Sequence, residues 1–268
     1  MSRERLPPGR GPRPRNGDWD LTKSRIPAWS AAMFQAREHR IVGILQPSYL
    51  PWLGYFEQIH HADVFVLYDD VQFEKGSWRN RNRIKTPNGP LWLTVPVLTK
   101  GRDFPPINEV LLNNAEPWAR KHQRSLEQYY SKAPFFRDYA PALFEVLTQP
   151  WTGLADLNIA LIRHLCGALG IATPLLLASE LGVSGSGAQR LMDILDKLGG
   201  AVFYEGSAGR NYIDETQFAA RGQQVRYQDY EHPVYAQLHG DFIPYLSVVD
   251  LLFNHGPDSL HILTRSAS

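Results

Sequence analysis

The sequence of 268 residues lacks several features that place a protein in a class at first sight. It has a single cysteine, Cys166, which excludes an internal disulfide bond and fits a reducing cytoplasm. No run of about 18 apolar residues occurs, so we expect no membrane-spanning helix. The net charge of +1 gives no surplus of either sign, and we therefore expect no nucleic-acid partner.

Motifs that identify common enzyme classes are also missing. The chain contains no G-x-S-x-G, H-E-x-x-H or C-x-x-C pattern and no P-loop. These absences disfavour serine hydrolases, zincins and Walker-type nucleotide hydrolases. We assign no metal site, and the sequence does not identify a cofactor.

The first 39 residues differ in composition from the rest of the chain. They are rich in Arg, Pro and Gly and have no apolar segment of the kind found in secretory signals. Such a segment cannot bury enough apolar surface to order itself, so residues 1–39 are predicted to form a disordered tail, with an arm that touches nucleic acid or membrane as the alternative. Residues 40–268 are predicted to form one α/β domain.

Alternating strand and helix patterns at both ends of that domain set the expected fold. Residues 40–46 (RIVGILQ) and 63–70 (DVFVLYDD) have the composition of buried strands, and residues 51–62 between them have helical spacing. Strand and helix patterns alternate again over residues 173–231. We predict a mostly parallel, Rossmann-like sheet flanked by helices.

The middle of the chain is predicted to be an insertion into this sheet. Residues 77–89 and 91–99 suggest a β-hairpin around a Pro-Asn-Gly turn, and residues 107–114 suggest another strand. Helical spacing follows over residues 118–171. Glycine is typical of helix C-termini, so we expect the last of these helices to end at Gly170.

The loop after the first strand is the first candidate site, because ligands of parallel sheets gather beyond the carboxyl ends of strands. Gln46 ends the strand, Gly54 permits close approach of a backbone or ligand, and three aromatic residues, Tyr49, Trp52 and Tyr55, offer stacking faces. The alternative is that these aromatic side chains anchor the helix to the sheet.

Two acids, Asp69 and Asp70, end the second predicted strand. They could hold Mg²⁺ or a ribose, or they could belong to a solvated turn or an ion pair with an arginine. The chain has no G-x-G-x-x-G after its first strand, which weakens the comparison with dinucleotide sites.

A basic stretch follows at residues 79–85 (RNRNRIK). Strand periodicity places one set of residues on one face, namely Arg79, Arg81, Arg83 and Lys85, and the other set, Asn80 and Asn82, on the opposite face. A row of cations suits phosphate or carboxylate, whereas an edge strand uses such charges to block aggregation.

Two small-residue loops near the carboxyl end could bind anions through backbone amides. One is residues 184–190; the other, residues 204–214, supplies Ser207, Gly209, Arg210 and Tyr212. Toward the end of the chain, Asp250 and Asn254 lie four residues apart and therefore on one side of a predicted helix. Among the histidines, His122 is the best candidate for acid–base chemistry.

Several of these blocks, in their order along the chain, resemble the WbqC-like protein family. The first is residues 46–97, beginning QPSYLPWLGYFEQ, and the later ones are YEGSAGRNYID and LSVVDLLFNHG, so the resemblance spans about residues 41–256. Twelve residues fall on its motif positions: Gln46, Pro51, Trp52, Gly54, Tyr55, Asn80, Arg81, Ser207, Gly209, Tyr212, Asp250 and Asn254.

The resemblance implies a role in bacterial O-antigen, other surface-glycan or specialised-metabolite biosynthesis. We expect a cytoplasmic enzyme that forms an amide by acyl or aminoacyl transfer to an amine, with His122 or Asp70 removing the amine proton. The substrate would be a small molecule, such as a nucleotide sugar or a carrier-protein thioester.

In the expected enzyme, the anionic groups of the substrate would be held by Arg81, Arg83 and Arg210. We also expect Trp52, Arg81 and Arg210 to border one shared cavity. A metal-dependent glycosyltransferase and a non-catalytic binding module are the alternatives.

Overall fold

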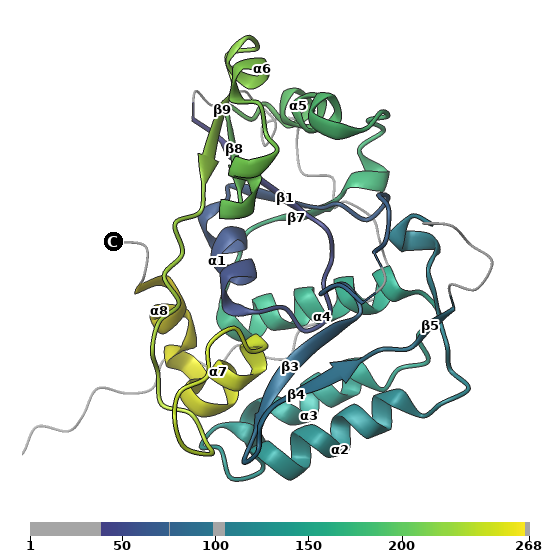
Figure 1. The fold of residues 1–268 in the computed structure, drawn as a ribbon, viewed down its shortest axis with the longest axis vertical. Coiled ribbons are helices and arrows are strands. Elements are labelled where there is room, and N and C mark those ends of the chain that lie inside the picture. Colours follow the sequence, from purple (N-terminus) through teal and green to yellow (C-terminus); the bar gives the residue numbers. More distant parts are fainter. Residues whose placement is uncertain (1–38, 75, 99–104, 266–268) are drawn as a thin grey trace, which may run out of the picture.

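The structure is a computed structural model in which residues 39–74, 76–98 and 105–265 are described. The predicted tail, apart from its last residue, lies outside the described residues. Figure 1 shows the central sheet and the helices α5 and α6 in the upper part of the molecule, with the hairpin and the remaining helices below.

The core of the fold is a five-stranded, fully parallel sheet with strand order β7-β2-β1-β8-β9. Its strands are β1 (Ile41–Leu45), β2 (Val64–Leu67), β7 (Leu175–Leu177), β8 (Val202–Glu205) and β9 (Gln224–Tyr227). Counted along the chain this order is 3-2-1-4-5, the doubly wound arrangement, which confirms the predicted fold class. The order reverses between β1 and β8.

Helices cover both faces of this sheet because the strand side chains alternate. On one face, Val42, Ile44, Val64 and Val66 pack against α5 (Gly187–Leu198) and α6 (Glu215–Ala219). On the other face, Phe65 and Leu67 pack into a larger core with α1 (Leu53–His61) and α4 (Leu154–Leu169). The predicted first strand–helix–strand unit is thus confirmed, with β1 and β2 in parallel register.

The predicted insertion lies between β2 and β7. It begins with an antiparallel hairpin of β3 (Arg81–Thr86) and β4 (Gly89–Thr94), closed at the predicted turn. A small antiparallel pair follows, β5 (Val97–Leu98) with β6 (Leu111–Leu112). The strand predicted over residues 107–114 is wrong in extent, because Ile107–Glu109 forms a short 3-10 helix, η2, before the two-residue β6.

Helices complete the insertion and the carboxyl end. They are α2 (Trp118–Tyr130), α3 (Phe136–Leu147), α7 (Val248–His255) and α8 (Ser259–Thr264), with short 3-10 turns η3 (Ala178–Glu180), η4 (Ser207–Asn211) and η5 (Gly256–Asp258). Gly170 ends α4 in the left-handed conformation, with φ 77°, as predicted. None of the described helices has the length and apolar character needed to cross a membrane.

Candidate functional site

The carboxyl ends of β1 and β8 lie side by side at the point where the strand order reverses. In open parallel sheets this crevice is the usual ligand position, since the loops from the two strands diverge there. Gln46 follows β1, and Glu205 is the last residue of β8. These two polar side chains therefore define the centre of the candidate site.

Glu205 is a buried carboxyl, with 7% of its surface exposed. Its Oε1 accepts hydrogen bonds from the Gly206 amide at 3.0 Å and the Tyr212 hydroxyl at 3.4 Å. Burial disfavours the ionised form and raises the pKa of Glu205 to about 7, although these two donors and Arg79 act in the opposite direction. A carboxyl with such a pKa exchanges a proton readily near neutral pH.

Gly209 explains how the backbone packs so tightly against this acid. A methyl group added at Gly209 would lie 2.5 Å from the Glu205 side chain. A residue with a side chain at this position would therefore displace Glu205 or the loop. The predicted importance of Gly209 thus gains a steric reason.

Arg79 supplies a cation to the same crevice. Its Nε donates to the Gln46 side-chain oxygen at 2.8 Å and its Nη1 donates to the Ser48 hydroxyl at 2.6 Å. Among the described residues, no carboxylate forms an ion pair with Arg79. Because its hydrogen-bond partners are neutral, this guanidinium can attract an anionic ligand as well as the nearby Glu205 carboxylate.

Two hydrogen-bonded side chains from the core hold these loops in place. Asn158 of α4 donates to the carbonyl oxygens of Pro47, at 3.1 Å, and of Arg79, at 2.7 Å. The Tyr55 hydroxyl donates to the Gln46 carbonyl at 3.1 Å. Segments that are far apart in the sequence are thereby fixed relative to one another.

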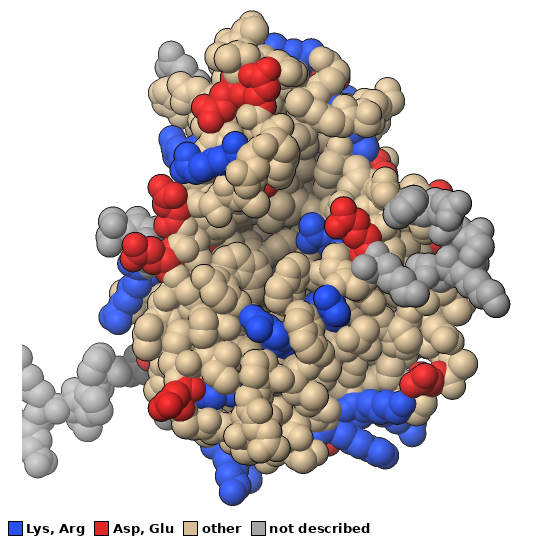
Figure 2. All heavy atoms as spheres, in the orientation of Figure 1, with Lys and Arg blue, Asp and Glu red and all other residues tan. Residues whose placement is uncertain are grey.

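A cavity of about 550 Å³ adjoins this crevice. It lies between the loop after β2 and the start of α5, and Gln72 and Tyr212 form part of its wall. Both residues also reach the crevice, because the Gln46 side chain donates to the Gln72 carbonyl and Tyr212 donates to Glu205. Figure 2 shows that this face is hollowed between the upper part, with α6, and the lower part, with β3.

The two acids predicted after β2 have different environments. Both oxygens of Asp69 accept hydrogen bonds from Ser179, at 3.0 Å from its amide and 2.7 Å from its hydroxyl, so Asp69 joins two loops. Asp70 lines the cavity and forms a 2.5 Å ion pair with Arg190. The predicted ion-pair alternative therefore describes Asp70.

The basic stretch divides into three environments. Arg81 and Arg83 lie on the hairpin beside two exposed tryptophans, with the Arg81 guanidinium 4.4 Å from the centre of the Trp92 ring. Lys85 is buried, and its ammonium donates to the Gly240 and Asp241 carbonyls, so its prediction as part of an open cation row is wrong. Arg79 precedes β3 and points to the crevice instead.

Trp52 lies in an aromatic cluster with residues from the segment after β9. Its ring centre is 5.5 Å from that of Tyr230 and 5.6 Å from that of Tyr245. Its indole also lies directly over Gly54, leaving no space for a side chain there. Arg83 donates to the Tyr245 carbonyl at 3.1 Å, which connects this cluster to the hairpin.

Arg210 and Ser207 are exposed on η4. The Arg210 guanidinium lies 4.4 Å from the centre of the Tyr227 ring and 3.4 Å from an Asp229 oxygen. We expected Trp52, Arg81 and Arg210 to border one cavity, and none of the three lines either of the two cavities described.

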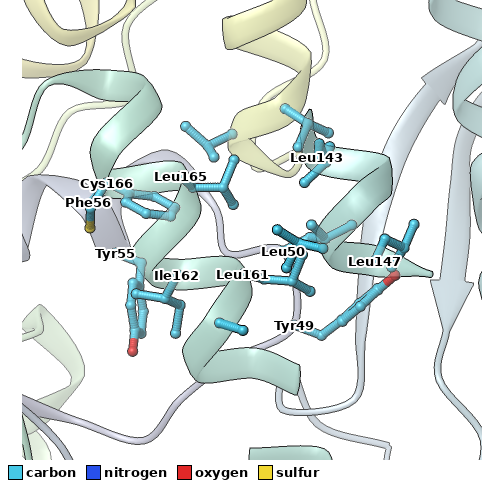
Figure 3. Close-up of a cluster of buried hydrophobic side chains, with 14 of the residues drawn as sticks. Tyr49, Leu50, Tyr55, Phe56, Leu143, Leu147, Leu161, Ile162, Leu165 and Cys166 are labelled. Atoms are coloured by element: carbon cyan, nitrogen blue, oxygen red, sulfur yellow. The ribbon is translucent and has the colours of Figure 1, made fainter. Parts of the chain in front are cut away.

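Several other candidate residues lie inside the core. Figure 3 shows Tyr49 and Tyr55 among aliphatic side chains of α3 and α4, with Cys166 in the same cluster. The two tyrosines are 0% and 4% exposed, so they are not available for stacking on a ligand. The buried set comprises Tyr49, Tyr55, Asn80, His122, Asp250 and Asn254.

The polar members of this buried set bond to neighbouring core groups. Asn80 donates to the Val95 carbonyl at 2.9 Å. Asp250 accepts from the Tyr130 hydroxyl at 2.7 Å, and the Asn254 amide donates to the Asp250 carbonyl at 2.8 Å. These contacts favour structural roles over the predicted binding roles.

His122 is also a core residue, which argues against its predicted role as a base. It is 6% exposed, and its Nδ1 lies 2.8 Å from the Tyr49 hydroxyl. Burial lowers the pKa of His122 to about 4, which keeps the ring neutral. A neutral imidazole hydrogen-bonded inside the core fits a structural role.

Sequence reasoning overlooked Glu205 and gave Arg79 only a general role. Glu205 ends an apolar strand, as Asp69 and Asp70 do, so the same rule could have identified it. The position of Arg79 could not be inferred, because it depends on the turn before β3. Among the described residues, no group of three or more His, Cys, Asp or Glu side chains is arranged to hold a metal ion.

Comparisons with known proteins agree with the sequence blocks. The model of the WbqC-like protein family matches residues 46–262. A relative from Mycobacterium tuberculosis (strain ATCC 25618 / H37Rv), called "Uncharacterized protein Rv1507c", is 39% identical over 220 residues, which is 81% of this chain and 95% of that protein. No solved structure matches the chain.

Proposed function

The chain belongs to the WbqC-like protein family, and we propose that it is an enzyme that forms an amide by acyl or aminoacyl transfer to an amine. The observation that carries this proposal is that Glu205, whose pKa is raised to about 7, lies near Arg79, which forms no ion pair within 4 Å among the described residues, at the crevice between β1 and β8. One group suits proton transfer near neutral pH and the other suits an anion.

In the proposed reaction, ionised Glu205 removes a proton from the attacking amine. The amine nitrogen forms a bond to the acyl carbon, and the bond from that carbon to the thiolate or phosphate leaving group breaks. Glu205 then returns the proton to the leaving group or to solvent. Arg79 holds an anionic group of the substrate, because its three unshared N–H directions suit carboxylate or phosphate oxygens.

The outer arginines supply further contacts in this proposal. Arg81 and Arg83 lie beside the exposed rings of Trp78 and Trp92, and Arg210 lies at the end of η4. They would attract an anionic substrate toward the crevice. Asp70, predicted as a base, serves better as a binding group because Arg190 holds it as an ion pair.

A metal-dependent glycosyltransferase is the second candidate, and a non-catalytic binding module is the third. For the second, Asp69 and Asp70 would have to exchange their bonds to Ser179 and Arg190 for metal contacts. The module is favoured only if substrates bind and no product forms. Glu205 favours either enzyme over the module, because a module needs no base. The bonds of Asp69 to Ser179 and of Asp70 to Arg190 favour the first candidate over the glycosyltransferase.

The test uses Glu205→Gln, which keeps the shape and removes the base. Purified protein is incubated with a panel of acyl and aminoacyl thioesters and amino-sugar nucleotides, and amide products are detected by mass spectrometry. We expect wild-type turnover and a loss of about 10²–10⁴-fold in Glu205→Gln. Glu231→Gln, which changes an exposed glutamate, is the matched control.

Three outcomes would redirect the assignment. Unchanged amide formation in Glu205→Gln would contradict the role of Glu205. Release of nucleoside diphosphate that requires Mg²⁺ or Mn²⁺ would favour the glycosyltransferase. Binding of an amino-sugar nucleotide with no product from any thioester would favour the module.

The biological setting follows from the family resemblance. We propose a cytoplasmic location, which a chain with one buried cysteine tolerates, and a role in surface-glycan or specialised-metabolite assembly. The substrates would be small molecules. One α/β domain over residues 40–268 remains our prediction.

A further inference from the structure

We propose that the cavity between the loop after β2 and the start of α5 binds the nucleoside part of a nucleotide-linked amine, which presents its amino group to Glu205. The inference rests on the proposed function for the role of that amine. It selects a nucleotide over a carrier-protein arm as the handle of the acceptor. Neither the family match nor the relative assigns a ligand to this cavity.

The size and walls of the cavity suit a planar base. Its volume of about 550 Å³ lies within the range of about 300–1,000 Å³ that is usual for small-molecule sites. One part of its wall is apolar or aromatic, and comprises Tyr68, Val71, Ala188, Leu191 and Ile213. A heterocyclic base buries its faces against such a wall, whereas a solvated ion does not need one.

Asp70 gives the cavity a specific hydrogen-bond acceptor. Its Oδ2 is held by Arg190 at 2.5 Å, while its Oδ1 has no hydrogen-bond partner and is inaccessible to solvent. Because Oδ1 is enclosed by protein, a ligand hydroxyl meets Asp70 at Oδ2, which can accept a second hydrogen bond beside the one from Arg190. The vicinal hydroxyl groups of a ribose are donors of the right kind.

A neighbouring cavity gives room for the groups attached to the nucleoside. Its volume is about 450 Å³, and it shares Asp70, Gly185 and Arg190 with the first cavity. Gly185 and Gly187 have φ angles of 102° and 60°, so the loop presents backbone rather than side chains at this wall. Backbone amides and the hydroxyls of Ser184 and Ser186 can donate to phosphate oxygens there.

The usual dinucleotide position after β1 is blocked in this fold. Tyr49 and Leu50 fill the core beneath that loop with no exposed surface, and the Trp52 ring covers Gly54 at the start of α1. A pyrophosphate therefore cannot lie against the backbone there as it does in G-x-G-x-x-G sites. The half-open cavity beside β2 lies on this same edge and has room for a nucleoside.

The position of the cavity connects it to the proposed base. Tyr212 lines the cavity and donates to Glu205 at 3.4 Å, so a group that extends from the cavity past Tyr212 reaches the carboxyl. Gln72 makes a similar connection toward Gln46 and Arg79. A nucleotide bound with its base at the α5 wall can thus direct an attached amino sugar to the crevice.

The experiment measures binding of UDP, CDP, GDP and ADP to the full chain by calorimetry, followed by the 2′-deoxy form of the tightest binder. We expect at least one nucleotide to bind, and its 2′-deoxy form to bind at least tenfold more weakly. Asp70→Asn should weaken the ribonucleotide at least tenfold and should remove most of the preference over the deoxy form.

A second variant avoids dependence on the Asp70–Arg190 ion pair. Ala188→Phe fills the cavity from the first turn of α5 and should abolish nucleotide binding. Two controls leave the cavity untouched: Asp193→Asn, which breaks the exposed ion pair with Arg221, and Ala219→Phe, on the exposed end of α6. Both should bind the nucleotide as the wild type does.

The outcomes separate this inference from the proposed function. If Glu205→Gln loses turnover but binds nucleotide normally, both stand. The inference is overturned if no nucleotide binds, if Ala188→Phe leaves binding unchanged, or if the ribose 2′-hydroxyl makes no difference. Binding of pantetheine that is blocked by Ala188→Phe would assign the cavity to a carrier arm instead, without affecting the role of Glu205.

Discussion

Replacing Glu205 with Gln should change how the stability of the protein depends on pH. The raised pKa means that the folded state retains a proton on Glu205 at pH values where the unfolded chain has lost it. Between the unfolded pKa of 4.5 and the folded pKa of about 7, stability from this group therefore falls as pH rises. Glutamine cannot ionise, so the variant is free of this loss.

The magnitude follows from the size of the shift. A shift from 4.5 to about 7 corresponds to about 3 kcal/mol between the acidic and alkaline limits. From pH 5 to pH 8, roughly 2–3 kcal/mol of this difference develops, because only about 1 kcal/mol is already present at pH 5. The residue is buried, so solvent screening reduces the value little.

The assay is urea unfolding of wild type and Glu205→Gln at pH 5, 6, 7 and 8. The free energy of unfolding of the variant relative to wild type should rise by roughly 2–3 kcal/mol over this range. Glu231→Gln, at an exposed site, should show no such trend. A difference that stays constant with pH would refute the raised pKa and, with it, the main support for Glu205 as a base.

Two further predictions concern residues identified in the sequence. Arg81→Ala should reduce turnover at least tenfold while shifting the melting temperature little, because its contact with the partly exposed Trp92 ring is worth about 0.5–1 kcal/mol. Equal loss of fold and activity would show that Arg81 is structural. His122→Ala should lower the free energy of unfolding by about 2–4 kcal/mol, because the substitution removes buried packing and the hydrogen-bond partner of Tyr49. The turnover of the folded fraction should stay unchanged. Circular dichroism measures the stability and the amide assay measures the turnover; lost turnover in stable protein would restore the catalytic role of His122.

The sequence correctly predicted those elements whose structure depends mainly on residues close by in the chain. The first strand–helix–strand unit, the hairpin turn and the end of α4 at Gly170 follow from burial pattern, turn residues and helix capping. In each case the decisive contacts lie within a few turns or one crossover of the chain. Such features can be inferred without knowledge of the tertiary structure.

The candidate site was less predictable because it depends on distant contacts. Lys85 follows the alternation of a basic strand, yet packing against residues 240 and 241 buries it. Glu205 becomes unusual only when β8 packs beside β1 and Gly209 folds over it. The pKa of a side chain reflects the whole environment, which the order of residues along one strand does not reveal.

The two hydrogen bonds from Asn158 have a consequence for how the protein unfolds on heating. One amide on a core helix joins backbone positions 111 and 79 residues away. The loops that contain Pro47 and Arg79 cannot separate unless α4 also moves, so the crevice should not unfold independently of α4. Thermal inactivation should therefore follow the cooperative unfolding of the entire domain, without an earlier step confined to the loops.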